Sequence, residues 1–223
     1  MKKIDFDEVS HTYTVDGKDK PSVTQILKAV GLFPDFWGKD EDLAWYMRRG
    51  SMVHKGVEHI LEWMIANNIL RPMTEQAKID TTINHYIEAQ DEEIQGYLRS
   101  FRDFLFDETM KVHPIATEKK VYSQKHDFCG TIDMTANIYC LGKVWADAVI
   151  DFKCGQPEPE YAFQTAGYVL GLGDPLNSQR LRLGVYLDKN GKKARVCPYT
   201  KSSDMQVFQA ARYVYSKQRG SHD

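Results

Sequence analysis

The spacing of apolar residues predicts helices in both halves of the chain. Apolar positions recur every three or four residues over 40–69 and over 81–106, which is the period of an amphipathic helix. Gly50 is expected to break the first of these helices. Residues 157–171 have a similar pattern, and Ser203 is placed to cap a last helix that ends near residue 217.

A second pattern, rich in β-branched and aromatic residues, predicts strands in the second half of the chain. The segments with this pattern are residues 116–123, 127–138, 143–152, 181–187 and 194–198. The first three follow one another directly, and a helix separates them from the last two. Strands mixed with helices in this order predict an α/β or α+β fold.

The N-terminal segment carries the signals of a β-hairpin and a short helix. Residues 4–15 alternate between apolar and polar, and residues 16–17, Asp-Gly, favour a turn. Ser22 and Gln25 have the spacing of a capping box, so a helix should begin there and end at Gly31.

Length and charge limit the domain organisation and the mode of nucleic-acid binding. A chain of 223 residues with 42% hydrophobic content can bury the core of one compact domain. We expect a single domain over residues 1–223, with a mainly helical part at 1–110 and an α/β part at 111–223. The 29 basic residues are balanced by 31 acidic ones, so any binding of nucleic acid must come from local patches.

The cysteines and the apolar runs argue against several classes of protein. Cys129, Cys140, Cys154 and Cys197 form no C-x-x-C pair, which argues against a zinc site or an ordinary iron–sulfur cluster. No signal sequence is recognisable, and no apolar run approaches the roughly 20 residues that span a bilayer. We therefore expect a cytoplasmic protein that does not bind membranes.

A carboxylate and an amine follow the apolar segment at residues 148–150. Asp151 and Lys153 lie two positions apart, so both side chains point to the same face of the predicted strand. The same acid-x-lysine pattern occurs at residues 16–18 and 118–120, and the spacing alone is therefore unspecific. Residues 16–18 belong to a turn, whereas Asp151 leaves a buried strand and precedes a loop, which is a common location for binding groups.

A second acid, Asp133, interrupts the apolar strand segment at 127–138. If this strand pairs with residues 143–152, Asp133 and Asp151 converge. Two neighbouring carboxylates stay ionised at low cost only when a cation neutralises them, and oxygen ligands suit Mg²⁺ or Mn²⁺. Either acid taken alone is also compatible with a salt bridge or a cap at a strand end, but the combination with Lys153 predicts a metal centre.

Five short motifs in order resemble the PD-(D/E)XK nuclease superfamily, and within it the RecB-like exonuclease branch. That branch includes phage and bacterial exonucleases, the CRISPR-associated adaptation nucleases and the mitochondrial genome maintenance exonuclease. The motifs are Gly50-Ser-Met-Val-His54, Glu118, Gly130-Thr-Ile-Asp133, Val149-Ile-Asp151-Phe-Lys153 and Gln164-Thr-Ala-Gly-Tyr168. The resemblance covers roughly residues 50–187. It implies a central mixed β-sheet flanked by helices, elaborated by an N-terminal hairpin and helices.

The resemblance also implies an activity and a set of catalytic residues. The chain would be a metal-dependent DNA nuclease, an exonuclease on single-stranded or end-containing DNA that leaves 5′-phosphate and 3′-hydroxyl products. His54, Asp133, Asp151 and the backbone carbonyl of Phe152 would hold one or two Mg²⁺ or Mn²⁺ ions, and the imidazole would favour Mn²⁺. Lys153 would orient or deprotonate the attacking water and offset charge on the phosphate.

Three further residues are candidates for support of this centre. Gln164 and Tyr168 lie four positions apart on a predicted helix and can share the face that meets the cleft. The resemblance implies that they contact DNA or shape the site. Glu118 is a candidate for outer support or for a second metal ion.

The expected partners are DNA and proteins of recombination or replication. Arg48, Arg49 and Lys55 flank His54 and could bind the DNA backbone, although a basic cluster is by default a solvated face. Two other functions compete with nuclease activity. A catalytically silent DNA-binding or scaffold protein could have the same fold, and a hydrolase of small phosphate esters could have a similar centre. Against the second alternative, this sequence contains no glycine-rich loop of the kind that binds phosphate groups.

Overall fold

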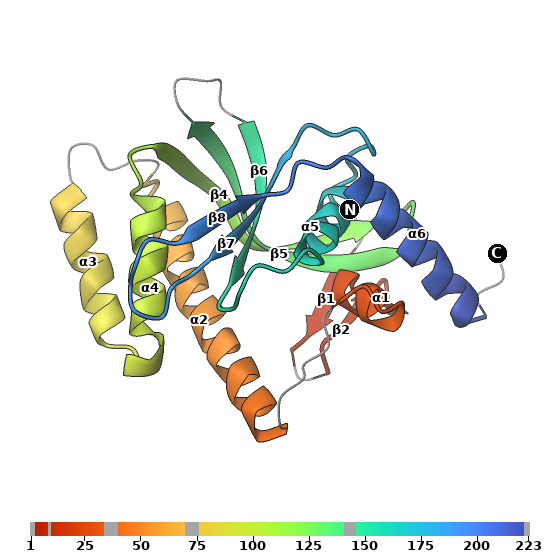
Figure 1. The fold of residues 1–223 in the computed structure, drawn as a ribbon, viewed down its shortest axis with the longest axis horizontal. Helices are drawn as coiled ribbons and strands as arrows, with labels where there is room; N and C mark the ends of the chain where they lie inside the picture. Colours follow the sequence, from red (N-terminus) through yellow and green to blue (C-terminus); the bar gives the residue numbers. More distant parts are fainter. Residues whose placement is uncertain (1–2, 9, 34–39, 70–75, 141–145, 221–223) are drawn as a thin grey trace.

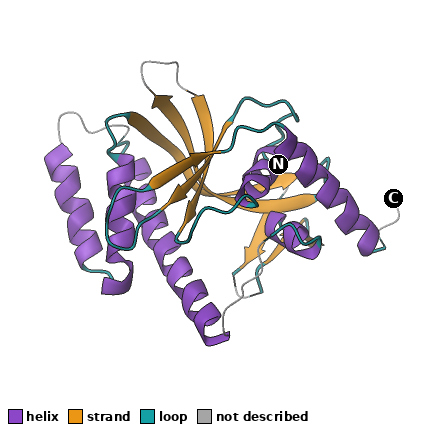
Figure 2. Cartoon of the chain, viewed as in Figure 1, coloured by secondary structure: helices purple, strands orange, loops and turns teal. Residues whose placement is uncertain are grey.

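The computed structural model describes residues 3–8, 10–33, 40–69, 76–140 and 146–220. Within these ranges the helices are α1 (Val23–Ala29), α2 (Asp40–Ala66), α3 (Gln76–Glu88), α4 (Glu92–Leu105), α5 (Tyr161–Gly171) and α6 (Ser203–Gln218). The strands are β1 (Ile4–Asp7), β2 (Thr12–Val15), β3 (Lys18–Lys20), β4 (Met110–Ser123), β5 (Phe128–Cys140), β6 (Ala146–Lys153), β7 (Leu181–Tyr186) and β8 (Arg195–Pro198). Figure 2 shows how the helices surround the strands.

The strands form a large mixed sheet and a small antiparallel one. The large sheet has five strands in the order β4-β5-β6-β7-β8, and the small one has the order β1-β2-β3. Only β6 and β7 run parallel in the large sheet, and α5 makes the crossover between them. An α/β fold with a central mixed sheet and flanking helices is therefore confirmed.

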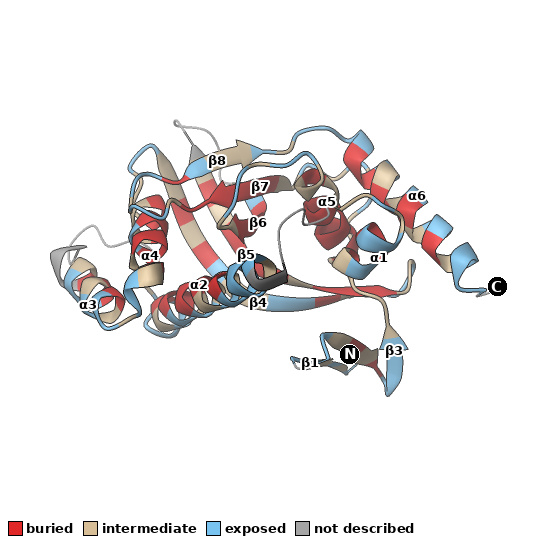
Figure 3. Ribbon diagram, turned by 60° about the horizontal axis from the view of Figure 1, so that its bottom comes forward, coloured by how far each residue is buried: buried red, intermediate tan, exposed pale blue. Residues whose placement is uncertain are grey.

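Helices cover both faces of the large sheet (Figure 1). Helices α2, α3 and α4 pack with one face in the larger apolar cluster, and α1, α5 and α6 pack with the other. Successive side chains of a strand point to opposite faces of the sheet, and strand β6 shows this: Ile150 and Phe152 lie in the first cluster, whereas Val149 lies in the second. Figure 3 shows buried residues along the strands and on the sheet-facing sides of α2, α4 and α5. In the described parts of the chain, every helix is too short or too polar to cross a lipid bilayer.

Two predictions about the helices are wrong. Helix α2 continues through Gly50, where the helix interior tolerates glycine at a cost of about 1 kcal/mol. The helix expected over residues 81–106 is two helices, α3 and α4. The Asp91 side chain accepts a hydrogen bond from the N–H of Glu93 and starts α4 afresh, so a capping signal overrides the continuous apolar period.

The segment boundaries differ in a few places. The turn at residues 16–17 has the expected left-handed backbone, but it joins β2 to β3, a strand that the polar sequence Lys-Asp-Lys did not indicate. The capping box of Ser22 and Gln25 is confirmed. Strand β4 begins at Met110 rather than at residue 116, and α5 begins at Tyr161 rather than at residue 157.

The predicted cap at Ser203 is also wrong, and one predicted start cannot be compared. Ser203 is already helical, and Ser202 occupies the cap position without a side-chain hydrogen bond. The predicted start of the third strand, at residues 143–145, lies outside the described residues.

Candidate active site

The candidate site lies where β5 and β6 stop pairing. The antiparallel register between these strands ends at Met134 and Ile150. Beyond this point, the main-chain N–H of Phe152 donates a hydrogen bond of 2.7 Å to Oδ2 of Asp133. The carboxylate thus occupies a position that a strand carbonyl would otherwise fill. Asp133 is fixed in this way between two strands, with 8% of its surface exposed.

Two further ligand-type side chains lie beside Asp133. Helix α2 carries His54, whose Nδ1 is 3.6 Å from Asp133 Oδ2. Strand β4 carries Glu118, which the register of Thr117 with Met134 and of Lys119 with Ile132 sets opposite Asp133. One ligand atom from each of His54, Glu118 and Asp133 lies within 4.8 Å of the others. A metal ion of ordinary size could contact all three.

Glu118 has a backbone conformation that is rare for a residue other than glycine. Its φ is +45°, in the left-handed region, although it lies within a long strand. Such outliers cost of the order of 1–3 kcal/mol and cluster at functional sites. The distortion interrupts the β4–β5 ladder at the point where Glu118 meets Asp133.

The end of β6 supplies an acid and a base that are paired with each other. Nζ of Lys153 lies 2.7 Å from Oδ2 of Asp151, and only 1% of Asp151 is exposed. The Lys153 ammonium also lies 4.6 Å from the centre of the Tyr161 ring, at the start of α5. This pair confirms the expectation that both side chains lie on the same face of the strand.

Burial and neighbouring negative charges shift the pKa values of the acids and of Lys153. Burial, followed by repulsion from Asp133, raises the pKa of Glu118 to about 8. Burial also raises the pKa of Asp151, and Asp133 adds to this effect while the Lys153 ammonium opposes it. Burial would lower the pKa of Lys153, but Asp151 and Asp133 raise it above its usual value. Lys153 is therefore positively charged at neutral pH.

Helix α5 presents Gln164 and Tyr168 to the same region. Nε2 of Gln164 donates a 2.8 Å hydrogen bond to the Tyr168 hydroxyl oxygen, and both side chains are buried. Burial and repulsion from Asp151 and Asp133 raise the pKa of Tyr168. The Gln164 Oε1 acceptor has no hydrogen-bond partner within the described ranges. Gln164 thus has a free acceptor next to the acidic cluster.

The arrangement differs in emphasis from the predicted ligand set. Glu118, predicted as outer support or as a residue for a second metal ion, lies in one cluster with His54 and Asp133. Asp151 instead forms an ion pair with Lys153. The contact that the structure shows for the Phe152 backbone is made by its N–H group, which donates a hydrogen bond to Asp133. The role of the Phe152 carbonyl as a ligand stays a prediction.

Arg49 is a neighbour of the site whose burial the sequence did not reveal. It is only 8% exposed, and its guanidinium lies 4.5 Å from the Trp45 ring centre and 4.8 Å from that of Tyr46. Its Nη2 donates to the carbonyl of Cys154, at 3.5 Å, next to Lys153 in the chain. The only sequence signal was its proximity to His54, which does not distinguish a buried arginine from a solvated one.

Comparison of the sequence with family models gives no match, and a search of curated proteins finds none that is similar. The interpretation of the site therefore depends on its geometry and on the motifs in the sequence.

Proposed function

We propose that this protein is a metal-dependent DNA nuclease of the PD-(D/E)XK type. The observation that carries the proposal is the convergence of His54, Glu118 and Asp133 beside the Asp151–Lys153 pair. One helix and three neighbouring strands supply these groups. The order of the motifs along the chain supports the same assignment. The proposed products have 5′-phosphate and 3′-hydroxyl ends.

The donor set fits a divalent cation such as Mg²⁺ or Mn²⁺. Carboxylate oxygens are the ligands that both ions prefer, and one imidazole makes the site more favourable for Mn²⁺. The pKa of Glu118 is raised by burial and then by repulsion from Asp133, and a bound cation would favour the ionised carboxylate against both effects. His54, Glu118 and Asp133 would hold the ion, with Asp151 next to them. When bound, the ion would polarise a phosphate and lower the pKa of a water.

The charge state of Lys153 favours one of its two predicted roles. The neighbouring acids keep it protonated, so in this state it donates hydrogen bonds and cannot accept a proton. Lys153 would orient the water and offset the charge that grows on the phosphate oxygens. The hydrogen bond from Phe152 to Asp133 holds that carboxylate in a fixed direction.

The surroundings of the site favour a nucleic acid over a small phosphate ester. Trp45 and Tyr46 are 44% and 45% exposed on α2, two turns before His54, and both contact the Arg49 guanidinium. Exposed aromatic rings beside a cation are typical of surfaces that stack unpaired bases. We therefore propose single-stranded DNA or DNA ends as the substrate class.

Hydrolysis of end-labelled single-stranded and duplex DNA, with Mn²⁺, Mg²⁺ or a chelator, tests the proposal. We expect cleavage only with metal, and its loss in Asp133→Asn and Asp151→Asn. Calorimetric titration with Mn²⁺ should show weakened binding by both variants. The control is Asp147→Asn, which removes an exposed acid from the same strand, β6.

The alternatives predict other outcomes. DNA binding without cleavage at any metal concentration would indicate the catalytically silent scaffold. Hydrolysis of small phosphate esters without cleavage of DNA would indicate the other hydrolase. Strands blocked at the 5′ or the 3′ end then determine the direction of digestion.

A further inference from the structure

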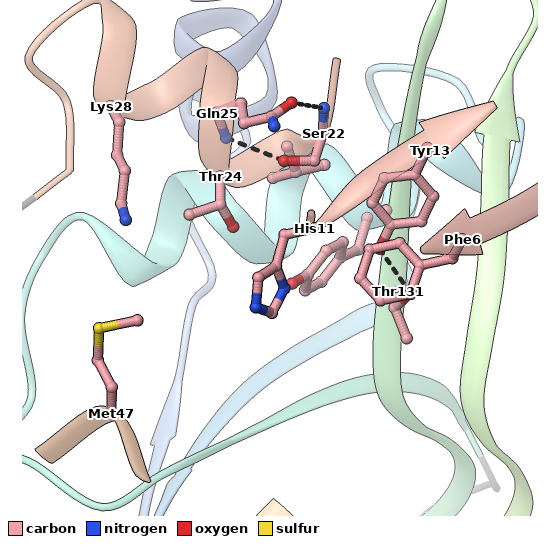
Figure 4. A pocket seen from close by; sticks show the side chains of 12 residues that line it. Phe6, His11, Tyr13, Ser22, Thr24, Gln25, Lys28, Met47 and Thr131 are labelled. Atoms are coloured by element: carbon pink, nitrogen blue, oxygen red, sulfur yellow. Dashed lines mark hydrogen bonds between the residues drawn. The ribbon is translucent and has the colours of Figure 1, made fainter. Parts of the chain in front are cut away.

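A cavity of about 400 Å³ lies beside the candidate active site (Figure 4). The small N-terminal sheet, the first turn of α1, strand β5 and helix α5 form its walls, and Met47 of α2 lies at its rim. Its volume is in the range of pockets that take a small organic ligand. Neither the metal ligands nor the Lys153 pair belongs to its lining.

Aromatic rings from the N-terminal hairpin form one wall of this cavity. The Phe6 and Tyr13 ring centres are 4.5 Å apart, and the His11 ring lies 6.0 Å from that of Phe6. His11 projects toward the middle of the cavity from the turn between β1 and β2. Its φ is +51°, an unusual conformation for histidine, and the side chain is exposed.

The charge of the cavity is positive, with polar groups on the opposite wall. None of the lining residues is acidic. Lys28 extends along the cavity from α1 and has no carboxylate partner among the residues that the structure describes. Lys120 approaches the Phe6 ring at 5.9 Å. The Tyr13 and Thr131 hydroxyls share a 2.6 Å hydrogen bond, and Thr24 offers another hydroxyl.

The cavity lies next to the acidic centre along strand β5. Thr131 lines it and precedes Asp133 by two residues on β5, a distance of about 7 Å along an extended strand. Tyr168 lines it as well, and its hydroxyl accepts the hydrogen bond from Gln164, the other α5 residue of the candidate site. The two sites are therefore separated by about the length of one nucleotide unit.

We propose that this cavity binds one unpaired nucleobase of the DNA strand whose adjacent phosphate lies at Asp133. This inference rests on the proposed nuclease function and deepens it. A flat base can stack on the aromatic wall of the cavity, since every base has a face that can stack. Lys28 carries the charge that the neighbouring backbone phosphate needs. A positively charged aromatic cavity without acids excludes a metal ion as the occupant.

A test uses single-stranded oligonucleotides that carry one abasic nucleotide at successive positions. Loss of one stacked base typically weakens an interaction by about 5- to 150-fold. With the wild-type protein, cleavage should slow by this factor at one bond, at a fixed distance from the abasic position. The affinity for the same strands can be measured by fluorescence anisotropy in a chelator, which prevents cleavage. It should fall for the strand whose abasic nucleotide occupies the cavity when the strand end is bound.

In the variants His11→Gly and Phe6→Leu, the abasic nucleotide should no longer slow cleavage at that bond. The missing base and the substituted ring would be opposite sides of the same contact, so their effects should not add. Glycine suits the left-handed backbone of residue 11, so the hairpin is preserved. Lys28→Gln should weaken all strands equally and reduce the dependence on salt. The control is His85→Ala, an exposed histidine on α3, far from the cavity.

The outcomes separate this inference from the proposed function. The cavity assignment alone would be overturned if cleavage required metal but no abasic position slowed it. It would also be overturned if the abasic nucleotide slowed cleavage equally in the wild type, His11→Gly and Phe6→Leu. Absence of both cleavage and DNA binding by the wild type would overturn the nuclease function and this inference together.

Discussion

The substitution Glu118→Gln should stabilise the metal-free protein, and the gain should grow with pH. The pKa of Glu118 rises from 4.5 to about 8 in the folded chain, chiefly through burial. The folded state thus binds the Glu118 proton more tightly than the unfolded state does. Stability falls as pH rises from about 4.5 to about 8 and is constant above that range. Glutamine has nearly the same shape and does not ionise, so the variant lacks this loss.

The magnitude follows from the difference between the two pKa values. One pKa unit corresponds to about 1.4 kcal/mol, so the upper bound above pH 8 is about 5 kcal/mol. Glu118 is only partly buried, and water screens its charge. We therefore expect a gain of about 1–2 kcal/mol, which corresponds to a rise in Tm of roughly 2–8 °C for a chain of this length.

Thermal unfolding of both proteins from pH 5 to pH 9 in a chelator measures this effect. The Tm values should coincide near pH 5 and separate progressively up to pH 8. Mn²⁺ should then stabilise the wild type more than the variant, because the carboxylate is a proposed ligand. Glu108→Gln, at an exposed acid just before β4, controls for the loss of one charge. A Tm difference that is independent of pH, or a destabilised variant at every pH, would refute the reasoning.

Three further substitutions address catalysis and packing. Lys153→Met should lower single-turnover DNA hydrolysis by about 10²- to 10⁴-fold, since it removes the ammonium bonded to Asp151, and wild-type turnover would move the catalytic centre elsewhere. His54→Ala should slow hydrolysis most at low Mn²⁺ and recover partly at high Mn²⁺, whereas a purely structural histidine would lower Tm with an unchanged metal curve. Gly96→Ala should lower the free energy of unfolding by about 1–3 kcal/mol or more, because a methyl group on α4 would overlap the backbone between β7 and β8, and an unchanged free energy in denaturant titration would contradict this packing.

The fold could be predicted well wherever one periodic pattern dominated. The strands of the large sheet and helices α2, α5 and α6 follow from apolar period and composition. The exceptions are the break expected at Gly50, which does not occur, and segment ends such as the start of β4. Prediction failed where a local signal competes with the period, as at the Asp91 cap that separates α3 from α4. It also failed at β3, whose residues pair with β2 although their side chains are polar. Backbone pairing determines that strand, and a side-chain pattern does not report it.

The candidate site was only partly predictable. Asp151 and Lys153 follow from strand period, because two residues on one strand share a face. The position of Glu118 could not be foreseen, since it depends on a left-handed backbone within β4 and on register with β5. The cavity around His11 combines residues from segments far apart in the chain. No local pattern records such a combination.

The acidic cluster of Glu118, Asp133 and Asp151 differs from the ordinary buried ion pair that Asp204 forms elsewhere in the fold. Asp204 is also buried, but Nη2 of Arg182 lies 2.8 Å from its Oδ2 and balances its charge. In the candidate site, Lys153 pairs with Asp151, and among the described residues no lysine or arginine forms an ion pair with Glu118 or Asp133. A fold does not gain stability from acids that repel one another at reduced exposure, or from a strained backbone that brings one of them closer. A bound cation would offset this cost, so a geometry that weakens the metal-free fold is what the proposed metal-dependent function requires.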